Sequence, residues 1–179
     1  YHGDESISDV KKDRDERAFL FLKEPGQLNM WINTDMGSHG VIKEPFLPNI
    51  TSGSEQFRYN TGYTNRKGVN PDKALCDNWG GYNGCIVYRS AEAYLNYIEA
   101  YYERHNTLDA KATAYWKAIR KRAGVDEDIQ KTIDATDMQK EAAANWSAYS
   151  AGKLVDKTLY NIRRERACEF MAEGYRTDD

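Results

Sequence analysis

Apolar and polar residues are spaced differently in the two halves of the chain. Residues 1–85 contain all four prolines and most of the glycines, so no apolar period persists there, and loops with short elements are predicted. From residue 86 onward proline is absent and glycine occurs only at 124, 152 and 174, which favours helices separated by caps. We expect a loop-rich segment, 1–85, and a helical segment, 86–179, within one mainly α fold with short strands.

The first predicted helix runs from Tyr88 to Arg104, with Ser90 as its N-cap. At 100° per residue its apolar side chains fall within an arc of about 140°, which predicts a core-facing stripe. The stripe consists of Tyr88, Ala91, Tyr94, Leu95, Ile98, Tyr101 and Tyr102. Three carboxylates follow one flank of it, Glu92, Glu99 and Glu103.

The second predicted helix runs from Asp109, its N-cap, to Ala123, and Gly124 stands where a left-handed residue ends a helix. A connection of about four residues predicts that it lies antiparallel to the first helix. Arg120 and Arg122 flank its apolar stripe, in which Trp116 is expected to be core. The stripe consists of Leu108, Ala112, Tyr115, Trp116, Ile119 and Ala123.

Two further helices are predicted. A polar helix over 137–150, with Thr136 and Gln139 in capping-box spacing, is expected to be an exposed insertion. The last helix starts at Asp156 and ends at Glu173, before Gly174. Its apolar arc consists of Leu159, Tyr160, Ala167, Phe170 and Met171.

The last helix also carries Glu165, Glu169 and Glu173 one turn apart, and like charges in this spacing repel. We expect cations to compensate them, locally and from the second helix. The predicted structural ion network comprises Glu92, Glu99, Arg120, Arg122, Glu165, Arg166, Glu169, Glu173 and Arg176. Catalysis by these carboxylates is disfavoured, because the stretch supplies no partner nucleophile, base or metal.

Charge and motifs exclude several classes of function. The 28 acids and 25 bases give a net charge of -3, which does not favour binding to nucleic acid or to an anionic membrane. No apolar run approaches the roughly 18 residues that a membrane helix needs. The three histidines are scattered, the usual catalytic motifs are missing, and no enzyme, metal site or cofactor is expected. A role for calcium stays open.

The three cysteines match no zinc-binding pattern. Cys76 and Cys85 flank an aromatic loop, and their spacing is compatible with a disulfide or with two thiols. Cys168 is expected to be a small packing residue inside the last helix.

Four stretches together resemble one known family. They are "NTGYTNRKGVNPDK" at 60–73, "YRSAEAYLNYIEAYYE" at 88–103, "AIRKRAGV" at 118–125 and "ERACEFMAEGYRTDD" at 165–179, with a fainter match in "DRDER" at 13–17. In this order they resemble the SusD/RagB family of nutrient-binding outer-membrane lipoproteins. The helix pair resembles the tetratricopeptide-like scaffold of that family.

The resemblance implies a non-catalytic protein on the surface of a Gram-negative bacterium. Such a protein captures oligosaccharides as a lid on a SusC-like, TonB-dependent transporter. The family pattern continues beyond the final Asp, and its N-terminal helices and lipid-bearing Cys have no counterpart here. We therefore expect this chain to be the later part of a longer one, with a lipid anchor outside it.

Ligand contact is predicted in the loop "CDNWGGYNGC" at 76–85. Sugar rings present apolar C–H faces and hydroxyl rims, which suit exposed aromatic planes beside a few polar groups. The candidate residues are Asp77, Asn78, Trp79, Tyr82 and Asn83, with Trp31 as a second aromatic candidate. Packing of Trp79 beneath the glycines is an equal alternative.

Two other functions compete with glycan capture. One is peptide capture by the same lid-and-barrel system, against which the aromatic loop argues modestly. The other is a helical-repeat scaffold that binds a protein partner, but no repeat of about 34 residues recurs in the chain.

Overall fold

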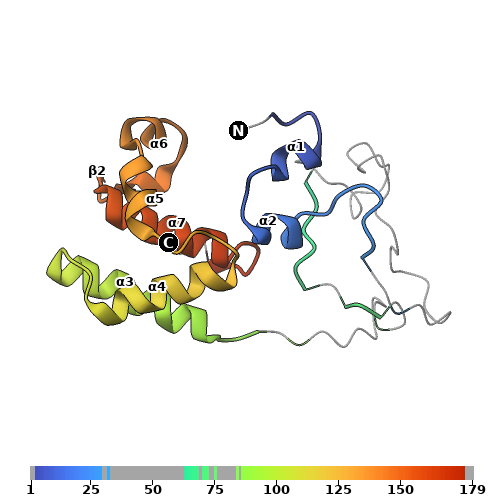
Figure 1. The fold of residues 1–179 in the computed structure, drawn as a ribbon, viewed down its shortest axis with the longest axis horizontal. Helices are drawn as coiled ribbons and strands as arrows, with labels where there is room; N and C mark the ends of the chain where they lie inside the picture. Colours follow the sequence, from blue (N-terminus) through green and yellow to red (C-terminus); the bar gives the residue numbers. More distant parts are fainter. Residues whose placement is uncertain are drawn as a thin grey trace. The chain divides into compact units, whose positions relative to one another are not determined.

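A computed structural model of the chain describes residues 3–29, 32, 63–68, 70–72, 75, 84 and 86–175 (Figure 1). The chain divides into two compact units, Tyr1–Cys85 and Ile86–Asp179. The described part is mainly helical, as the sequence predicts, and its strands are short. Among the described residues, no helix combines the length and the apolar content that crossing a bilayer requires.

The first unit contains two short helices, α1 (Ile7–Lys11) and α2 (Glu16–Phe21). Each starts at a polar N-cap, because the side chains of Ser6 and Asp15 accept hydrogen bonds from backbone N–H groups of the first turn. After α2 the chain pairs with residues 64–66. Leu22 and Asn65 form an antiparallel bridge, and the N–H of Lys23 donates to the Thr64 carbonyl at 2.8 Å.

The second unit begins with an antiparallel helical hairpin made of α3 (Ser90–His105) and α4 (Ala110–Arg122) (Figure 1). Asp109 caps α4 through a hydrogen bond from the N–H of Ala112, and Gly124 adopts a positive φ of 66° just after the helix, as predicted. This hairpin fits a tetratricopeptide-like scaffold.

The predicted start of α3 is wrong. Arg89, and not Ser90, occupies the N-cap position, and its side chain makes no capping hydrogen bond. Tyr88 therefore precedes the helix and is 61% exposed, although it was predicted to belong to the apolar stripe. The guanidinium of Arg89 reaches the end of another helix, α7 (Lys157–Glu169), which explains why this position is occupied by a long cation.

The stretch between α4 and α7 differs most from the prediction. A short helix, α5 (Ile129–Ala135), was missed; it is capped by Asp128 and buries Ile129 and Ile133. Thr136 ends α5, so the cap of the next helix, α6 (Met138–Ala144), is Asp137. No residue of α6 is buried, in agreement with its predicted exposure.

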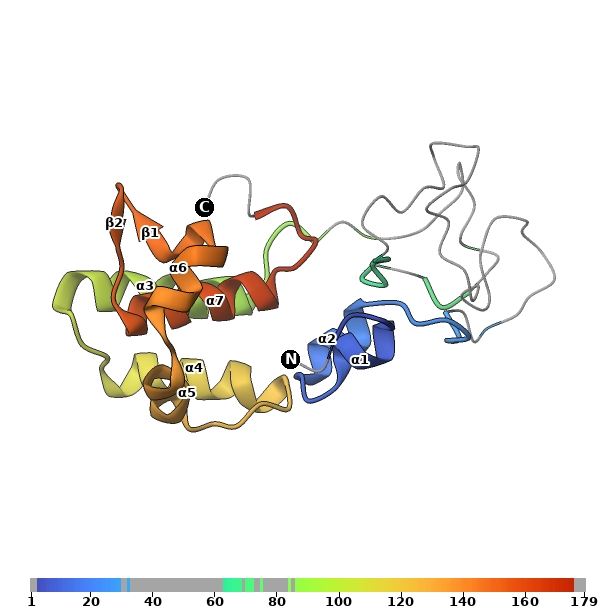
Figure 2. The same ribbon diagram turned by 90° about the horizontal axis from the view of Figure 1, so that it is seen from above.

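The predicted helix over 137–150 ends early because α6 stops at Ala144. It is followed by a 3-10 turn, η3 (Trp146–Ala148), and by a hairpin of β1 (Tyr149–Ser150) and β2 (Lys153–Leu154) (Figure 2). Ala151 and Gly152 connect the strands with φ values of 48° and 76°. Two consecutive residues with positive φ are typical of a tight hairpin turn.

The last helix, α7 (Lys157–Glu169), starts after its N-cap Asp156 as predicted, but ends four residues before Glu173. Ala172 and Gly174, with φ values of 62° and 86°, lie in the turn that follows. Helix α7 packs against both α3 and α5.

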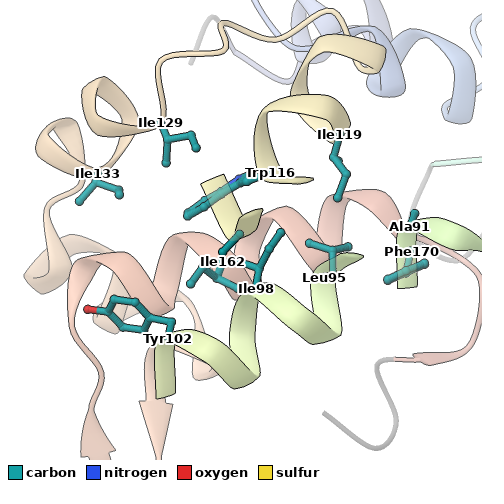
Figure 3. Close-up of a cluster of buried hydrophobic side chains, with 11 residues drawn as sticks. Ala91, Leu95, Ile98, Tyr102, Trp116, Ile119, Ile129, Ile133, Ile162 and Phe170 are labelled. Carbon is teal, nitrogen blue, oxygen red and sulfur yellow. The ribbon is translucent and has the colours of Figure 1, made fainter. Parts of the chain in front are cut away.

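The core of the second unit lies where α3, α4 and α7 meet. Figure 3 shows Ile98 of α3, Trp116 of α4 and Ile162 of α7 gathered at its centre, and none of the three exceeds 1% exposure. The predicted core position of Trp116 is confirmed. The rest of the cluster consists of Ala91, Leu95, Tyr102, Ala112, Ile119, Ile129, Ile133 and Phe170.

We predict that Trp116→Ala lowers the free energy of unfolding by about 3–5 kcal/mol, because it leaves a cavity among three helices. Urea denaturation followed by far-UV circular dichroism measures the change. The matched control is Lys117→Ala, one residue further along α4 and exposed, which should change stability by less than about 0.5 kcal/mol. Equal losses in the two variants would contradict the central position of the indole.

Candidate functional site

The residues predicted to contact ligand lie outside the described part of the chain. They are Asp77, Asn78, Trp79, Tyr82, Asn83 and Trp31, and the same holds for Cys76, Cys85 and Arg176. The structure does position the rest of the predicted ion network, which spans α3, α4 and α7.

Glu165 starts the acidic stripe of α7 inside the core. Its Oε2 accepts hydrogen bonds from Trp116 Nε1 at 3.2 Å and from Arg120 at 3.4 Å. The side chains of Glu165 and Arg120 are each only 5% exposed. A buried charge of this kind is tolerated only with a charged partner and further hydrogen bonds. Arg120 has both, because it also donates to the Asp126 carbonyl and to Thr132.

Glu169, one turn further, binds two arginines. Its Oε1 accepts from Arg89 and from Arg122, so the start of α3 and the end of α4 meet at one carboxylate. Burial by itself raises the pKa of Glu169, but the hydrogen bonds from Arg122 and Arg89 outweigh burial and hold that pKa below its ordinary value.

Arg89 is the residue that the sequence analysis missed. Besides Glu169 Oε1 it contacts both carboxylate oxygens of Glu173, at 2.9 and 3.0 Å, and the Glu169 carbonyl at 2.8 Å. Its guanidinium lies 4.5 Å from the ring centroid of Phe170. Burial lowers the pKa of Arg89, and the pairs with Glu173 and Glu169 more than reverse this effect. We define Arg89, Arg122, Glu169 and Glu173 as the arginine–glutamate clasp.

A second set of charges joins the acidic flank of α3 to α7. Arg163 donates to Glu99 at 2.9 Å and to Glu103 at 2.8 Å. Arg166 donates to Asn96 at 2.7 Å, a partner that the sequence did not suggest. After the helix, the Tyr175 hydroxyl donates to Glu92 at 2.8 Å.

These contacts give the charged residues an architectural role. The carboxylates that were predicted to form the network, in α3, in α7 and in the turn after α7, contact arginines or the Tyr175 hydroxyl. Within the described ranges, no three His, Cys, Asp or Glu residues are placed to hold a metal ion.

The opposite flank of α3 carries a row of aromatic rings. Tyr94 stacks on Tyr115 of α4 at a centroid distance of 4.2 Å, and Tyr115 meets the edge of Tyr97 at 5.6 Å. Tyr101 continues the row at 5.9 Å from Tyr97, and His105 ends it at 4.4 Å from Tyr101. The Tyr97 hydroxyl donates to Asp109 at 2.8 Å, which raises the pKa of Tyr97. We call the five rings, those of Tyr94, Tyr97, Tyr101, His105 and Tyr115, the tyrosine row.

A hollow of about 560 Å³ lies beside α7. Its lining includes Tyr160, Cys168 and Met171. The hydroxyl of Tyr160 donates to Glu141 at 2.5 Å and accepts from Asn145 at 3.1 Å, so its hydrogen bonds are made within the protein. The predicted packing role of Cys168 is wrong, because this residue lies on the exposed side of α7.

Comparison with known proteins gives one match. The model of the SusD family matches residues 5–179. No curated protein and no solved structure matches the chain.

We predict that Glu169→Gln lowers the free energy of unfolding at pH 7 by about 3 kcal/mol, because a buried carboxylate that holds two arginines is lost. Urea denaturation at pH 7 measures the loss. The matched control is Glu103→Gln, since the Glu103 side chain is 50% exposed and also binds an arginine; its loss should stay below about 1 kcal/mol.

The loss should also depend on pH. The pKa of Glu169 is lower in the folded state than its ordinary value of 4.5, so the unfolded chain binds more protons near that pH. The stabilisation is complete above pH 4.5 and is lost as the pH falls through the folded-state pKa. The difference between wild type and Glu169→Gln should therefore shrink in acid; a constant difference would contradict the ionised clasp.

Proposed function

Because the chain belongs to the SusD family, we propose that it captures oligosaccharides at the cell surface and passes them to a TonB-dependent, SusC-like transporter. The SusD family is associated with carbohydrate binding and with nutrient uptake at the outer-membrane surface. The observation that carries the proposal is the extent of the match, which covers residues 5–179 and therefore both units.

The structure supports separate sets of residues for holding the helices together and for recognising the ligand. The stretches that resemble the family in the second unit supply Arg89, Arg122 and Glu169, which hold three helices together. These charges pair with one another at helix interfaces, so the stretches that resemble the family form the helical scaffold. Recognition of a particular sugar then depends on residues outside the stretches that resemble the family. Because the sugar is captured without a reaction, those residues need no catalytic groups.

We propose that Trp79 and Tyr82 provide the aromatic planes for the sugar and that Asp77, Asn78 and Asn83 provide hydrogen bonds to its hydroxyl groups. Trp31 is the second aromatic contact that we propose. Stacking of a ring on an apolar sugar face combined with a few polar groups is the usual composition of such sites. We propose that a lipid anchor attaches the protein to the outer membrane.

Isothermal titration against a panel of neutral and acidic oligosaccharides tests the proposal, with a panel of short peptides as the second arm. Saturable binding to one class of glycan, with the glycan recovered unchanged, supports capture for uptake. Binding to peptides alone would replace glycan capture by peptide capture. Binding to neither would overturn the proposed function.

We predict that Trp79→Ala weakens glycan binding by about tenfold, since one stacked ring is worth about 1–2 kcal/mol. The thermal midpoint should stay within about 3 °C of wild type, which corresponds to about 1 kcal/mol for a chain of this length. The conservative variant Trp79→Phe keeps an aromatic plane and should retain most of the affinity.

Titration calorimetry and thermal unfolding are to be run on the same preparations. A large fall in the midpoint of Trp79→Ala would show that the ring packs beneath the loop glycines. Unchanged affinity in a stable Trp79→Ala variant would remove this residue from the ligand site.

A further inference from the structure

Helix α4 is unusually basic. Its sequence, AKATAYWKAIRKR, contains five cations and no carboxylate. Arg120 and Arg122 form ion pairs within the protein, with Glu165 and Glu169, although the Arg122 side chain stays 56% exposed. The other three, Lys111, Lys117 and Lys121, are exposed, and none forms an ion pair with a residue in the described ranges.

The three lysines share one side of the helix. At 3.6 residues per turn they fall within an arc of about 120°, on the side opposite the buried Trp116. The exposed residues between them are Ala110, Ala114 and Ala118, which leave the ammonium groups unobstructed. Arg104, in the last turn of α3, is a fourth exposed cation near the loop that leads into α4. We call Arg104, Lys111, Lys117 and Lys121 the basic face of the hairpin.

The basic face adjoins the tyrosine row. Lys111 Nζ lies 4.7 Å from the ring centroid of Tyr97 and 5.6 Å from that of Tyr115. The rings of Tyr97, Tyr101 and Tyr115 are partly exposed, so aromatic edges reach the surface beside the ammonium groups. Because these rings contact one another, they are held in place before any ligand arrives, which lowers the entropic cost of binding.

Lys111 interacts electrostatically with Asp109, whereas Lys117 and Lys121 have no carboxylate partner in the described ranges. These two lysines determine which ligand this surface suits. A neutral sugar would leave the positive charge uncompensated, whereas a sugar that carries carboxylate or sulfate groups compensates it and still offers C–H groups to the ring edges. The chain as a whole has a net charge of -3, so the basic face is a local feature. A generally basic protein would attract nucleic acid, which this balance does not favour.

We propose that the basic face of the α3–α4 hairpin is a second carbohydrate-binding surface, specific for polyanionic polysaccharides. This inference rests on the proposed function and names the class of glycan. The exposed lysines retain the charged groups of the chain electrostatically, and the partly exposed rim of the tyrosine row contacts the sugar rings. Binding here requires no aromatic residue of the loop at 76–85.

Affinity of the full chain for polygalacturonate tests the proposal, measured by titration calorimetry in low salt and in 150 mM salt. The double variant Lys117→Ala/Lys121→Ala should bind about tenfold more weakly in low salt. Its affinity should also fall less steeply with added salt, because fewer charges are compensated on binding. The variant Lys117→Arg/Lys121→Arg keeps both charges and should bind as wild type does.

The matched control is Lys140→Ala/Lys153→Ala, which removes two exposed lysines from α6 and β2 and changes the net charge equally. It should retain the wild-type affinity. A loss as large as that of Lys117→Ala/Lys121→Ala would show an effect of net charge and would overturn the assignment to α4.

Other outcomes separate this inference from the proposed function. Binding of neutral glycans without binding of polygalacturonate overturns the basic face as a glycan site and leaves the proposed function intact. DNA or an acidic protein, added at equal charge concentration, could also displace polygalacturonate. If that binding is weakened equally by Lys117→Ala/Lys121→Ala, the surface has no specificity for glycans, and the proposed glycan site is overturned.

Discussion

The paired carboxylate of Glu169 is the constraint on which the helical unit depends. A charge that is 3% exposed has lost nearly all its hydration, and it remains ionised only because Arg89 and Arg122 reach it from two other helices. The three side chains come from the start of α3, the end of α4 and the end of α7. Their meeting therefore fixes the position of three helix ends relative to one another, which apolar packing alone does less specifically.

Helix α3 shows how the three flanks of one helix match two neighbouring helices, α4 and α7. Its apolar stripe, centred on Leu95 and Ile98, enters the core between α4 and α7. On one flank, Glu99 meets an arginine of α7; on the other, Tyr94 and Tyr97 meet Tyr115 of α4. The acidic and aromatic flanks do not overlap on the helix, so each can match only one partner. This arrangement explains why a helix with so many polar residues still has a single mode of packing.

The sequence predicted those features that depend on local chemistry. The caps Asp109 and Asp156, the stop at Gly124 and the core position of Trp116 follow from single side chains or from helical periodicity, and the structure contains all four. Arg89 could not be predicted, because its partners lie 80 and 84 residues away. The only local signal was a long cation where a short capping side chain is usual.

The errors between α4 and α7 have a related cause. Helix α5 is short, so two buried isoleucines one turn apart were too weak a pattern to indicate it. The hairpin turn at Ala151 and Gly152 was not predicted, because only one of the two residues with positive φ is a glycine. The residues predicted to contact sugar lie outside the described ranges, so that prediction stands as the sequence made it.

The distribution of charge connects architecture with recognition. Arg89, Arg122 and Glu169 neutralise one another where three helix ends meet, so their charges serve the scaffold. Lys117 and Lys121, on the same helix as Arg122 but on its outer side, compensate no charge in the described protein. A surface that varies independently of the scaffold can change its ligand without loss of the fold. The exposed lysines of α4 take no part in the ion pairs of Arg120 and Arg122, so they can be replaced without loss of those pairs.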